Sequence, residues 1–253
     1  MDALPTRRAV WCGKHWIHLE QVDSTNDYLK RGDFPDGTAV LADRQVAGKG
    51  RQGKSWSGAS AGQAMYLSVL FHSMKISDMG LLPLLCGLAA ARSLGESAQI
   101  KWPNDVLLGG KKAVGILCES KIQGNEVCAI CGIGINLTQP AEFFAENDLP
   151  YGTSVRAQTG ETRTAKQAAG MLLDELEPIL DQYRREGFSP ILPAYCSRCV
   201  TLGRQVRVFQ GQQPIIAQAK GIAPDGGLIC EKQGMEFIVR AGEASVRGLY
   251  GYI

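Results

Sequence analysis

The chain has 253 residues, of which 45% are hydrophobic and 21% charged, and 27 Lys and Arg against 25 Asp and Glu give a formal net charge of +2. These globular values exclude collagen, coiled coils and wholesale disorder, and the small net charge excludes a general attraction to nucleic acids or membranes. No stretch reaches the roughly 18 consecutive apolar residues of a membrane span, and the N-terminus has no signal-peptide core. We expect a cytoplasmic protein with eight reduced cysteines.

The first half of the chain alternates between strand-like and helix-like segments. The strand-like runs are short and mostly apolar, and the first helix follows the capping residues Asp23, Ser24 and Thr25. The expected elements, in chain order, are a strand over 16–22, a helix ending near 32, a strand over 38–45, a loop over 46–63, a strand over 64–71 and a helix over 78–96.

Three further strand-like runs are expected over 100–108, 112–119 and 127–137. Glycine-containing turns separate them and indicate hairpins, so this part of the sheet is predicted to be antiparallel. Residues 138–162 are predicted as loop. The apolar positions of 164–186 recur at helical spacing and predict an amphipathic helix.

The pattern changes near residue 200, after which short β-like runs are broken by glycine and proline. Such runs predict a small β-barrel of about five strands. We therefore expect two domains, a larger one over 1–197 and a C-terminal one over 198–253.

Glycine and basic residues are concentrated in the loop Gly48 to Ser55, GKGRQGKS. Its spacing matches both the dinucleotide fingerprint and the phosphate loop of nucleotide hydrolases, but both require a helix directly after the glycines. The residues WSGASAG that follow are poor helix formers. No acidic residue lies between 44 and 75, so the loop is suited to close over an anionic phosphate; the alternative is a solvated basic surface loop.

A second motif, Lys101 to Asp105 (KWPND), places polar residues and a proline inside a strand-like run. A proline removes a backbone donor from a strand. Residues that do not suit the local secondary structure are expected at functional sites. Asp105 can hold Mg²⁺ or accept a proton from an amine, and Lys112 can neutralise a carboxylate or a phosphate. The alternative is a bulged hairpin with surface charges.

A third motif, Gly132 to Asn136 (GIGIN), has glycines at alternate strand positions. One face of the strand is then free of side chains, which leaves room for a ligand or for another backbone.

Cysteines form two CxxC pairs, Cys128 with Cys131 and Cys196 with Cys199, too far apart in sequence for a compact zinc site. Strand positions three apart face opposite sides, which argues against a metal at the first pair. The second pair can share a helix face, so a metal there stays open. Cys118 is expected in the core.

Together with the segment DSTN that begins at Asp23, these motifs resemble those of biotin protein ligases. The resemblance implies an α+β fold with a mixed or antiparallel sheet flanked by helices, as in class II aminoacyl-tRNA synthetases, and an SH3-like C-terminal β-barrel. It also implies two reactions: the biotin carboxylate attacks the α-phosphate of ATP to give biotinyl-AMP, and a lysine of a biotin carboxyl carrier protein then takes the biotin. Mg²⁺ is the implied metal.

The resemblance further implies a set of site residues. Biotin contacts are implied for Ser24, Thr25, Asn26, Gln45, Lys49, Gly50, Arg51, Lys112 and Gly115. Nucleotide contacts are implied for Arg51, Trp56, Lys101, Asn104, Asp105 and Asn136. Arg51, Lys112 and Asp105 are the catalytic candidates, and Asp105 is also the candidate Mg²⁺ ligand.

Two positions depart from the family pattern. Lys49 stands where an arginine is usual. A lysine ammonium binds an anion as a single point charge, whereas an arginine guanidinium can donate two parallel hydrogen bonds. The family's aromatic clamp over adenine has no clear counterpart, and Phe143 and Phe144 are the candidates.

Only 22 residues precede Asp23, which predicts the monofunctional type without a DNA-binding domain, no specific nucleic acid and no membrane partner. A homodimer through the central sheet is possible. The alternative functions are a lipoate or octanoate ligase or transferase of the same fold, a non-catalytic biotin-sensing protein and, more distantly, a phosphate-loop NTPase.

Overall fold

The computed structural model describes residues 4–253 except 54, 57–59, 73, 124–125, 210–212, 242–244 and 249–251. The first sheet consists of β1 (Trp16–Val22), β2 (Ala39–Gln45), β3 (Ala64–Phe71), β4 (Gln99–Lys101), β5 (Asp105–Leu108), β6 (Lys111–Gln123) and β7 (Glu126–Asn136). Its order is β1-β2-β3-β7-β6-β5-β4. Among these described strands β1 and β2 pair in parallel and the other neighbours pair antiparallel, so the sheet is mixed.

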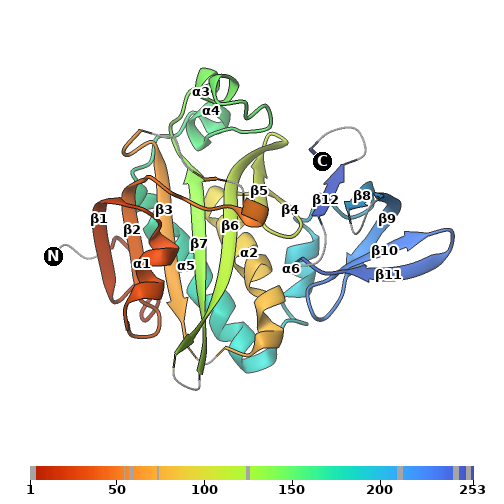
Figure 1. Cartoon of the computed structure of the whole chain (residues 1–253), viewed down its shortest axis with the longest axis horizontal. Coiled ribbons are helices and arrows are strands. Elements are labelled where there is room, and N and C mark those ends of the chain that lie inside the picture. Colours follow the sequence, from red (N-terminus) through yellow and green to blue (C-terminus); the bar gives the residue numbers. More distant parts are fainter. Residues whose placement is uncertain are drawn as a thin grey trace.

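Helices cover both faces of this sheet (Figure 1). The helices are α1 (Thr25–Arg31), α2 (Leu82–Leu94), α3 (Ala141–Glu146), α4 (Val155–Thr159), α5 (Ala165–Glu186) and α6 (Leu192–Cys196), with short 3₁₀ turns at Arg51–Gly53 and Ile76–Gly80. The main core lies between the sheet and the long helices α2 and α5, whereas α1 packs on the other face. Every residue of β3 is buried, as expected for a strand covered on both sides. The described helices include none with the length and apolar character needed to cross a membrane.

The chain ends in a second, five-stranded antiparallel sheet of order β11-β10-β9-β8-β12. Its strands are β8 (Gln205–Phe209), β9 (Ile215–Ile222), β10 (Leu228–Lys232), β11 (Met235–Val239) and β12 (Ser245–Gly248). Trp102 joins it to the first sheet, because its indole N–H donates to the Gly226 carbonyl at 3.0 Å and its backbone N–H donates to Thr201 Oγ1 at 3.0 Å. A domain boundary at residue 198 stays a prediction.

Two segments differ from the sequence-based expectation. The run 100–108 is not one strand but an antiparallel pair, β4 and β5, with Lys101 opposite Asp105. Proline and the turn-forming Asn104 lie between these strands and cannot continue a ladder. The segment 138–162, expected as loop, contains α3 and α4. Both helices are too short for a clear helical period, which explains why the sequence did not show them.

Two buried carboxylates of α5 hold the N-terminal segment. Asp174 and Glu177 accept hydrogen bonds of 2.6–2.9 Å from six successive backbone N–H groups, those of Arg7, Arg8, Ala9, Val10, Trp11 and Cys12. Burial alone raises the pKa of Asp174, but the backbone N–H groups outweigh it and hold the pKa below its ordinary value. Stability from this carboxylate is therefore present above its ordinary pKa and is lost as the pH falls through the lowered folded value.

We expect Asp174→Asn to lower the free energy of unfolding by about 2 kcal/mol at pH 7, because charge-assisted hydrogen bonds are lost. The free energy of unfolding of this variant should also fall less steeply as the pH is lowered. Urea unfolding at pH 7 and at several acidic values measures both. The matched control is Glu175→Gln, which removes a more exposed carboxylate paired with Arg8 and should cost under about 1 kcal/mol. Equal losses, or the same pH dependence for Asp174→Asn and the unsubstituted protein, would refute the assignment.

Candidate active site

The first cavity lies on the α1 face of the sheet, over β6 and β7. Gly115 pairs with Gly134 across these strands, and Leu117 pairs with Gly132. These residues line the cavity, while the alternate positions of both strands face the core. The residues that the resemblance implies for biotin all line it: Ser24, Thr25, Asn26, Gln45, Lys49, Gly50, Arg51, Lys112 and Gly115.

The floor of this cavity is a buried network of polar groups. Thr25 donates through its backbone N–H and its hydroxyl to Gln45 Oε1, at 2.8 and 3.0 Å. Asn26 donates to Glu119 Oε2 at 2.8 Å and accepts from Ser68 Oγ at 2.6 Å. Fixed donors and acceptors in a buried site recognise a polar head group rather than a plain hydrocarbon.

Trp56 fills much of the space above the glycines. A Cβ on Gly115 would lie 2.7 Å from its indole, and one on Gly134 would collide with it. Lys112 Nζ lies 5.2 Å from the centroid of the same ring. The cavity that remains is about 60 Å³, far below the roughly 300 Å³ or more of ordinary ligand pockets. A ligand of biotin's size therefore requires the indole to move.

The glycine loop folds back on itself in front of the sheet. Trp56 N–H donates to the Gly48 carbonyl at 2.8 Å, and a Cβ on Gly48 would collide with the carbonyl oxygen of Trp56. Arg51 donates to Asn104 Oδ1 at 2.9 Å and also to the Ala241 carbonyl. The loop thus connects the KWPND turn to the segment that follows β11.

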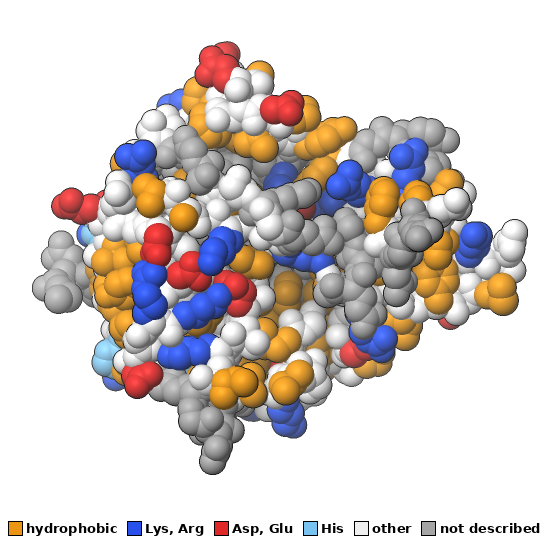
Figure 2. Space-filling model, in the orientation of Figure 1, with side chains coloured by type: hydrophobic (Ala, Val, Ile, Leu, Met, Phe, Trp, Pro, Cys, Tyr) orange, Lys and Arg blue, Asp and Glu red, His pale blue; other side chains and the backbone are white. Residues whose placement is uncertain are grey.

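Basic and acidic side chains interleave on the surface over α1 (Figure 2). Lys49 Nζ lies 2.7 Å from Asp27 Oδ2, and Lys30 Nζ lies 2.6 Å from Glu119 Oε1. The Asp27 carboxylate raises the pKa of Lys49. In this conformation the residue that replaces the usual arginine is therefore held by α1.

A second cavity, of about 460 Å³, adjoins the first and extends to the C-terminal sheet. The residues that the resemblance implies for the nucleotide all line it: Arg51, Trp56, Lys101, Asn104, Asp105 and Asn136. Phe143 and Phe144, the candidates for the adenine clamp, line it as well, at an edge-to-face angle of 88°. Asn136 donates to the Thr153 carbonyl and accepts from Gln139, both at 3.0 Å, and so holds both ends of the segment that contains α3 and these two rings.

Asp105 is a buried carboxylate of the second cavity with a partner at each oxygen. Lys112 Nζ lies 2.6 Å from Oδ1, and the hydroxyl of Tyr252 donates to Oδ2. Lys101 Nζ lies 4.3 Å from the Tyr252 ring centroid. Burial raises the pKa of Asp105, but Lys112, Lys101 and Tyr252 together outweigh it and hold the pKa below its ordinary value. Asp105 is therefore an ionised carboxylate.

Sequence patterns did not single out Tyr66, Tyr151, Arg247 or Tyr252, which also line the second cavity. Tyr151 and Tyr252 stack with ring centroids 5.1 Å apart. None of the four lies in a motif, and the last two come from the C-terminal part of the chain, so only the three-dimensional arrangement brings them to the site.

A phosphate-loop nucleotide site would need a helix directly after Ser55. The described residues 55–56 and 60–63 are not helical, and β3 begins at Ala64. These residues also lead into a strand that pairs with β2 and β7. The described residues therefore argue against a phosphate-loop NTPase.

Comparisons with known proteins give the same picture. The family model "Biotin/lipoate A/B protein ligase family" matches residues 18–136. The biotin–[acetyl-CoA-carboxylase] ligase of Mycobacterium tuberculosis is 33% identical, with 92% of this chain and 91% of the relative covered. The chain belongs to the biotin protein ligase family. The corresponding ligase of Paracoccus denitrificans is 32% identical, with 91% and 100% covered.

A solved biotin protein ligase, that of Aquifex aeolicus in complex with biotin and ATP, has a TM-score of 0.80 to this chain. It is 29% identical, and 93% of this chain and 99% of that one are covered. The predicted membership of the biotin protein ligase family and the predicted fold class are confirmed.

Proposed function

We propose that the protein activates biotin with ATP to biotinyl-AMP and pyrophosphate, and then transfers the biotin to a lysine of a biotin carboxyl carrier protein. One observation carries this proposal: the two cavities meet, and Arg51, Asn104 and Lys112 line both. An acid in the first cavity and a nucleotide in the second would bring carboxylate and α-phosphate together there. Cations at this point neutralise the charge of both reactants.

In the first reaction the polar floor holds the ureido ring, and Lys112 and Arg51 lie where the carboxylate and the α-phosphate meet. The carboxylate oxygen forms a bond to phosphorus, and pyrophosphate leaves. The folded-back loop then shields the mixed anhydride from water.

In the second reaction the amine of the carrier lysine attacks the carbonyl of biotinyl-AMP, and AMP leaves. Asp105 is ionised and lies beside Lys112 at 2.6 Å, where it can accept a hydrogen bond from the incoming amine. A carboxylate whose pKa is held low is a weak base, which favours orientation of the amine by Asp105 over removal of its proton.

Magnesium enters such reactions with the phosphates of ATP. Both carboxylate oxygens of Asp105 are engaged, one by Lys112 and one by Tyr252. Asp148, the other acidic residue among the described lining of the second cavity, is exposed. These residues do not form a metal site of their own, and Mg²⁺ at Asp105 stays a prediction. A homodimer stays a prediction too.

The alternative of lipoate or octanoate activation differs in what the first cavity must hold. Octanoate carries no polar group opposite its carboxylate, and it would leave the network of Thr25, Asn26 and Gln45 without a ligand partner. The ureido group of biotin can hydrogen-bond to such fixed polar groups and the alkyl end of octanoate cannot, which favours biotin.

Pyrophosphate release from ATP with biotin, lipoate, octanoate or no acid tests the proposal, followed by transfer to a carrier domain. We expect pyrophosphate to be released only when the acid is biotin, and one biotin to become attached to the carrier lysine. Release with octanoate would support the alternative acid. Biotin binding without pyrophosphate would indicate a sensor, and ATP hydrolysis without any acid a nucleotide hydrolase.

We expect Gly132→Ala to weaken biotin binding by about tenfold, or 1.4 kcal/mol. Its Cβ would lie 2.5 Å from Asn26 Oδ1, and Asn26 is held by Ser68 and Glu119. Calorimetric titration with biotin measures the change. Gly221→Ala is the matched control, since its Cβ would make an ordinary contact of 3.7 Å within the C-terminal sheet. Unchanged biotin affinity in Gly132→Ala would show that the floor does not bind the ligand.

A further inference from the structure

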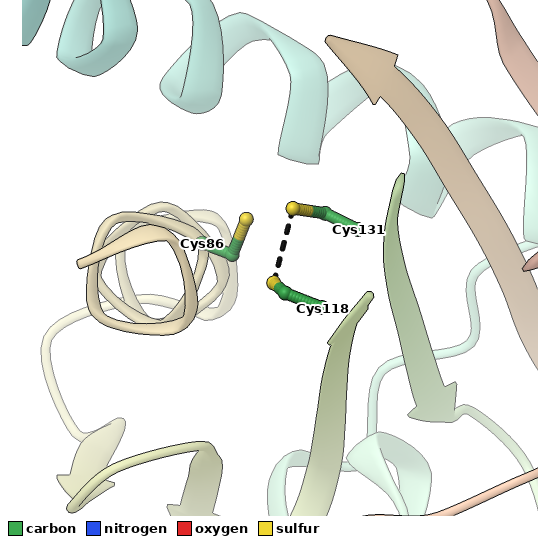
Figure 3. Close-up of side chains that lie close together, drawn as sticks. All are labelled: Cys86, Cys118 and Cys131. Carbon is green, nitrogen blue, oxygen red and sulfur yellow. Dashed lines mark hydrogen bonds between the residues drawn. The ribbon is translucent and has the colours of Figure 1, made fainter. Parts of the chain in front are cut away.

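Three cysteines from separate elements meet behind the first cavity (Figure 3). Cys86 lies in α2, Cys118 in β6 and Cys131 in β7, and their sulfur atoms all lie within 4.8 Å of one another. Cys118 and Cys131 are direct cross-strand partners with Sγ atoms 3.0 Å apart. We call these three residues the thiol triad. It belongs to neither cavity.

The geometry of the thiol triad is close to that of a three-coordinate thiolate site. Sulfur ligands lie about 2.3 Å from a bound ion, so three of them around one ion are at most about 4 Å apart, and closer where the ion lies out of their plane. The three sulfurs point toward one another between the helix and the strands (Figure 3). Small side-chain rotations are enough to place an ion among them.

The surroundings of the thiol triad decide which charge the ion must carry. Cys86 and Cys131 are fully buried in the main core, among apolar side chains. A buried net charge without a partner is costly. Three thiolates around a monovalent or divalent ion leave a negative charge there, whereas three thiolates around a trivalent ion form a neutral group.

We infer that the thiol triad is a binding site for a trivalent thiophilic ion, of which arsenic(III) is the probe. Neutral arsenous acid reacts with the three thiols without any redox change. Three arsenic–oxygen bonds break, three arsenic–sulfur bonds form, and the three hydroxyl groups leave with the thiol protons as three water molecules. Cys118 is partly exposed and offers the first point of attachment. Soft ligands of this kind select thiophilic ions over hard ones.

Binding at the thiol triad would tie α2 to the strands that form the cavity floor. Leu117 and Gly132 line the first cavity and directly adjoin Cys118 and Cys131 in sequence. They are also a cross-strand pair. Two members of the thiol triad are therefore direct sequence neighbours of residues that line the first cavity, on the opposite face of the sheet.

The test uses the full chain, kept reduced with a phosphine and titrated with arsenite under native mass spectrometry. We expect one bound arsenic with the loss of three hydrogens, and an affinity at least about tenfold weaker in Cys86→Ala, Cys118→Ala and Cys131→Ala. Cys128→Ala is the matched control, because it removes a buried cysteine from the other face of β7 and should bind as the unsubstituted protein does.

X-ray absorption at the arsenic edge of the unsubstituted protein gives a second readout that needs no variant. Three sulfur neighbours support the inference. Two sulfurs and one oxygen, equal affinity in the triad variants, or a loss of affinity in Cys128→Ala would each overturn it. A loss of two hydrogens without arsenic would instead show that two cysteines form a disulfide rather than binding the ion, and would also overturn it.

Discussion

Lys112→Ala is expected to reduce biotin-dependent pyrophosphate release by about 10²–10³-fold, the usual cost of removing a group that stabilises developing charge. Lys112 lines both cavities, and its Nζ lies 2.6 Å from Asp105 Oδ1. Its removal also leaves the Asp105 carboxylate, which is 7% exposed, without its ion-pair partner. Isotope exchange between pyrophosphate and ATP in the presence of biotin measures the loss.

Two controls make the Lys112 result specific. Lys111→Ala removes an exposed lysine from the preceding position of β6 and should leave exchange unchanged. A buried charge without its partner can destabilise a protein by about 3–5 kcal/mol, so circular dichroism must show that Lys112→Ala is folded at the assay temperature. Near-normal exchange in folded Lys112→Ala would refute the proposed role.

Arg51→Gly is expected to leave the first reaction largely working while biotinyl-AMP escapes about 10–100-fold faster. Arg51 fastens the loop to Asn104 and to the Ala241 carbonyl, and a charge-assisted hydrogen bond of this kind is worth about 1.5–3 kcal/mol. A glycine there also gives the loop more conformational freedom. Release of the intermediate from purified protein, and labelling of lysines on a bystander protein, measure the escape.

The control for Arg51 is Arg44→Ala, which removes an exposed arginine from β2. It should retain biotinyl-AMP as the unsubstituted protein does. Equal release from Arg51→Gly and the unsubstituted protein would show that the loop does not retain the intermediate.

The regular elements were predictable where a periodic pattern coincides with clear end signals. β3 has the expected bounds because eight apolar or small residues follow a glycine-rich loop. α5 begins one residue after the expected start because Thr164 and Gln167 form a capping box. Met171, one of the apolar residues in this helix, is nevertheless 39% exposed, since one position of a helical pattern can fall at the edge of the apolar stripe.

The candidate site was predictable from motifs but not from periodicity. Every residue implied by the resemblance lines one of the two cavities, because each motif lies where its strand or loop reaches the α1 face or the second sheet. Tyr252 and the thiol triad could not be predicted in this way. Their partners are distant in sequence, and no local pattern encodes that Cys86 lies beside a pair of strands.

The two carboxylates that hold residues 7–12 have a consequence for biosynthesis. The hydrogen bonds of Asp174 and Glu177 span 165–167 positions of the chain. During translation the first residues leave the ribosome early, yet their backbone donors acquire these acceptors only after α5 has emerged. Because contacts of such long range form late and slowly, residues 7–12 must stay undocked in the nascent chain until α5 has emerged.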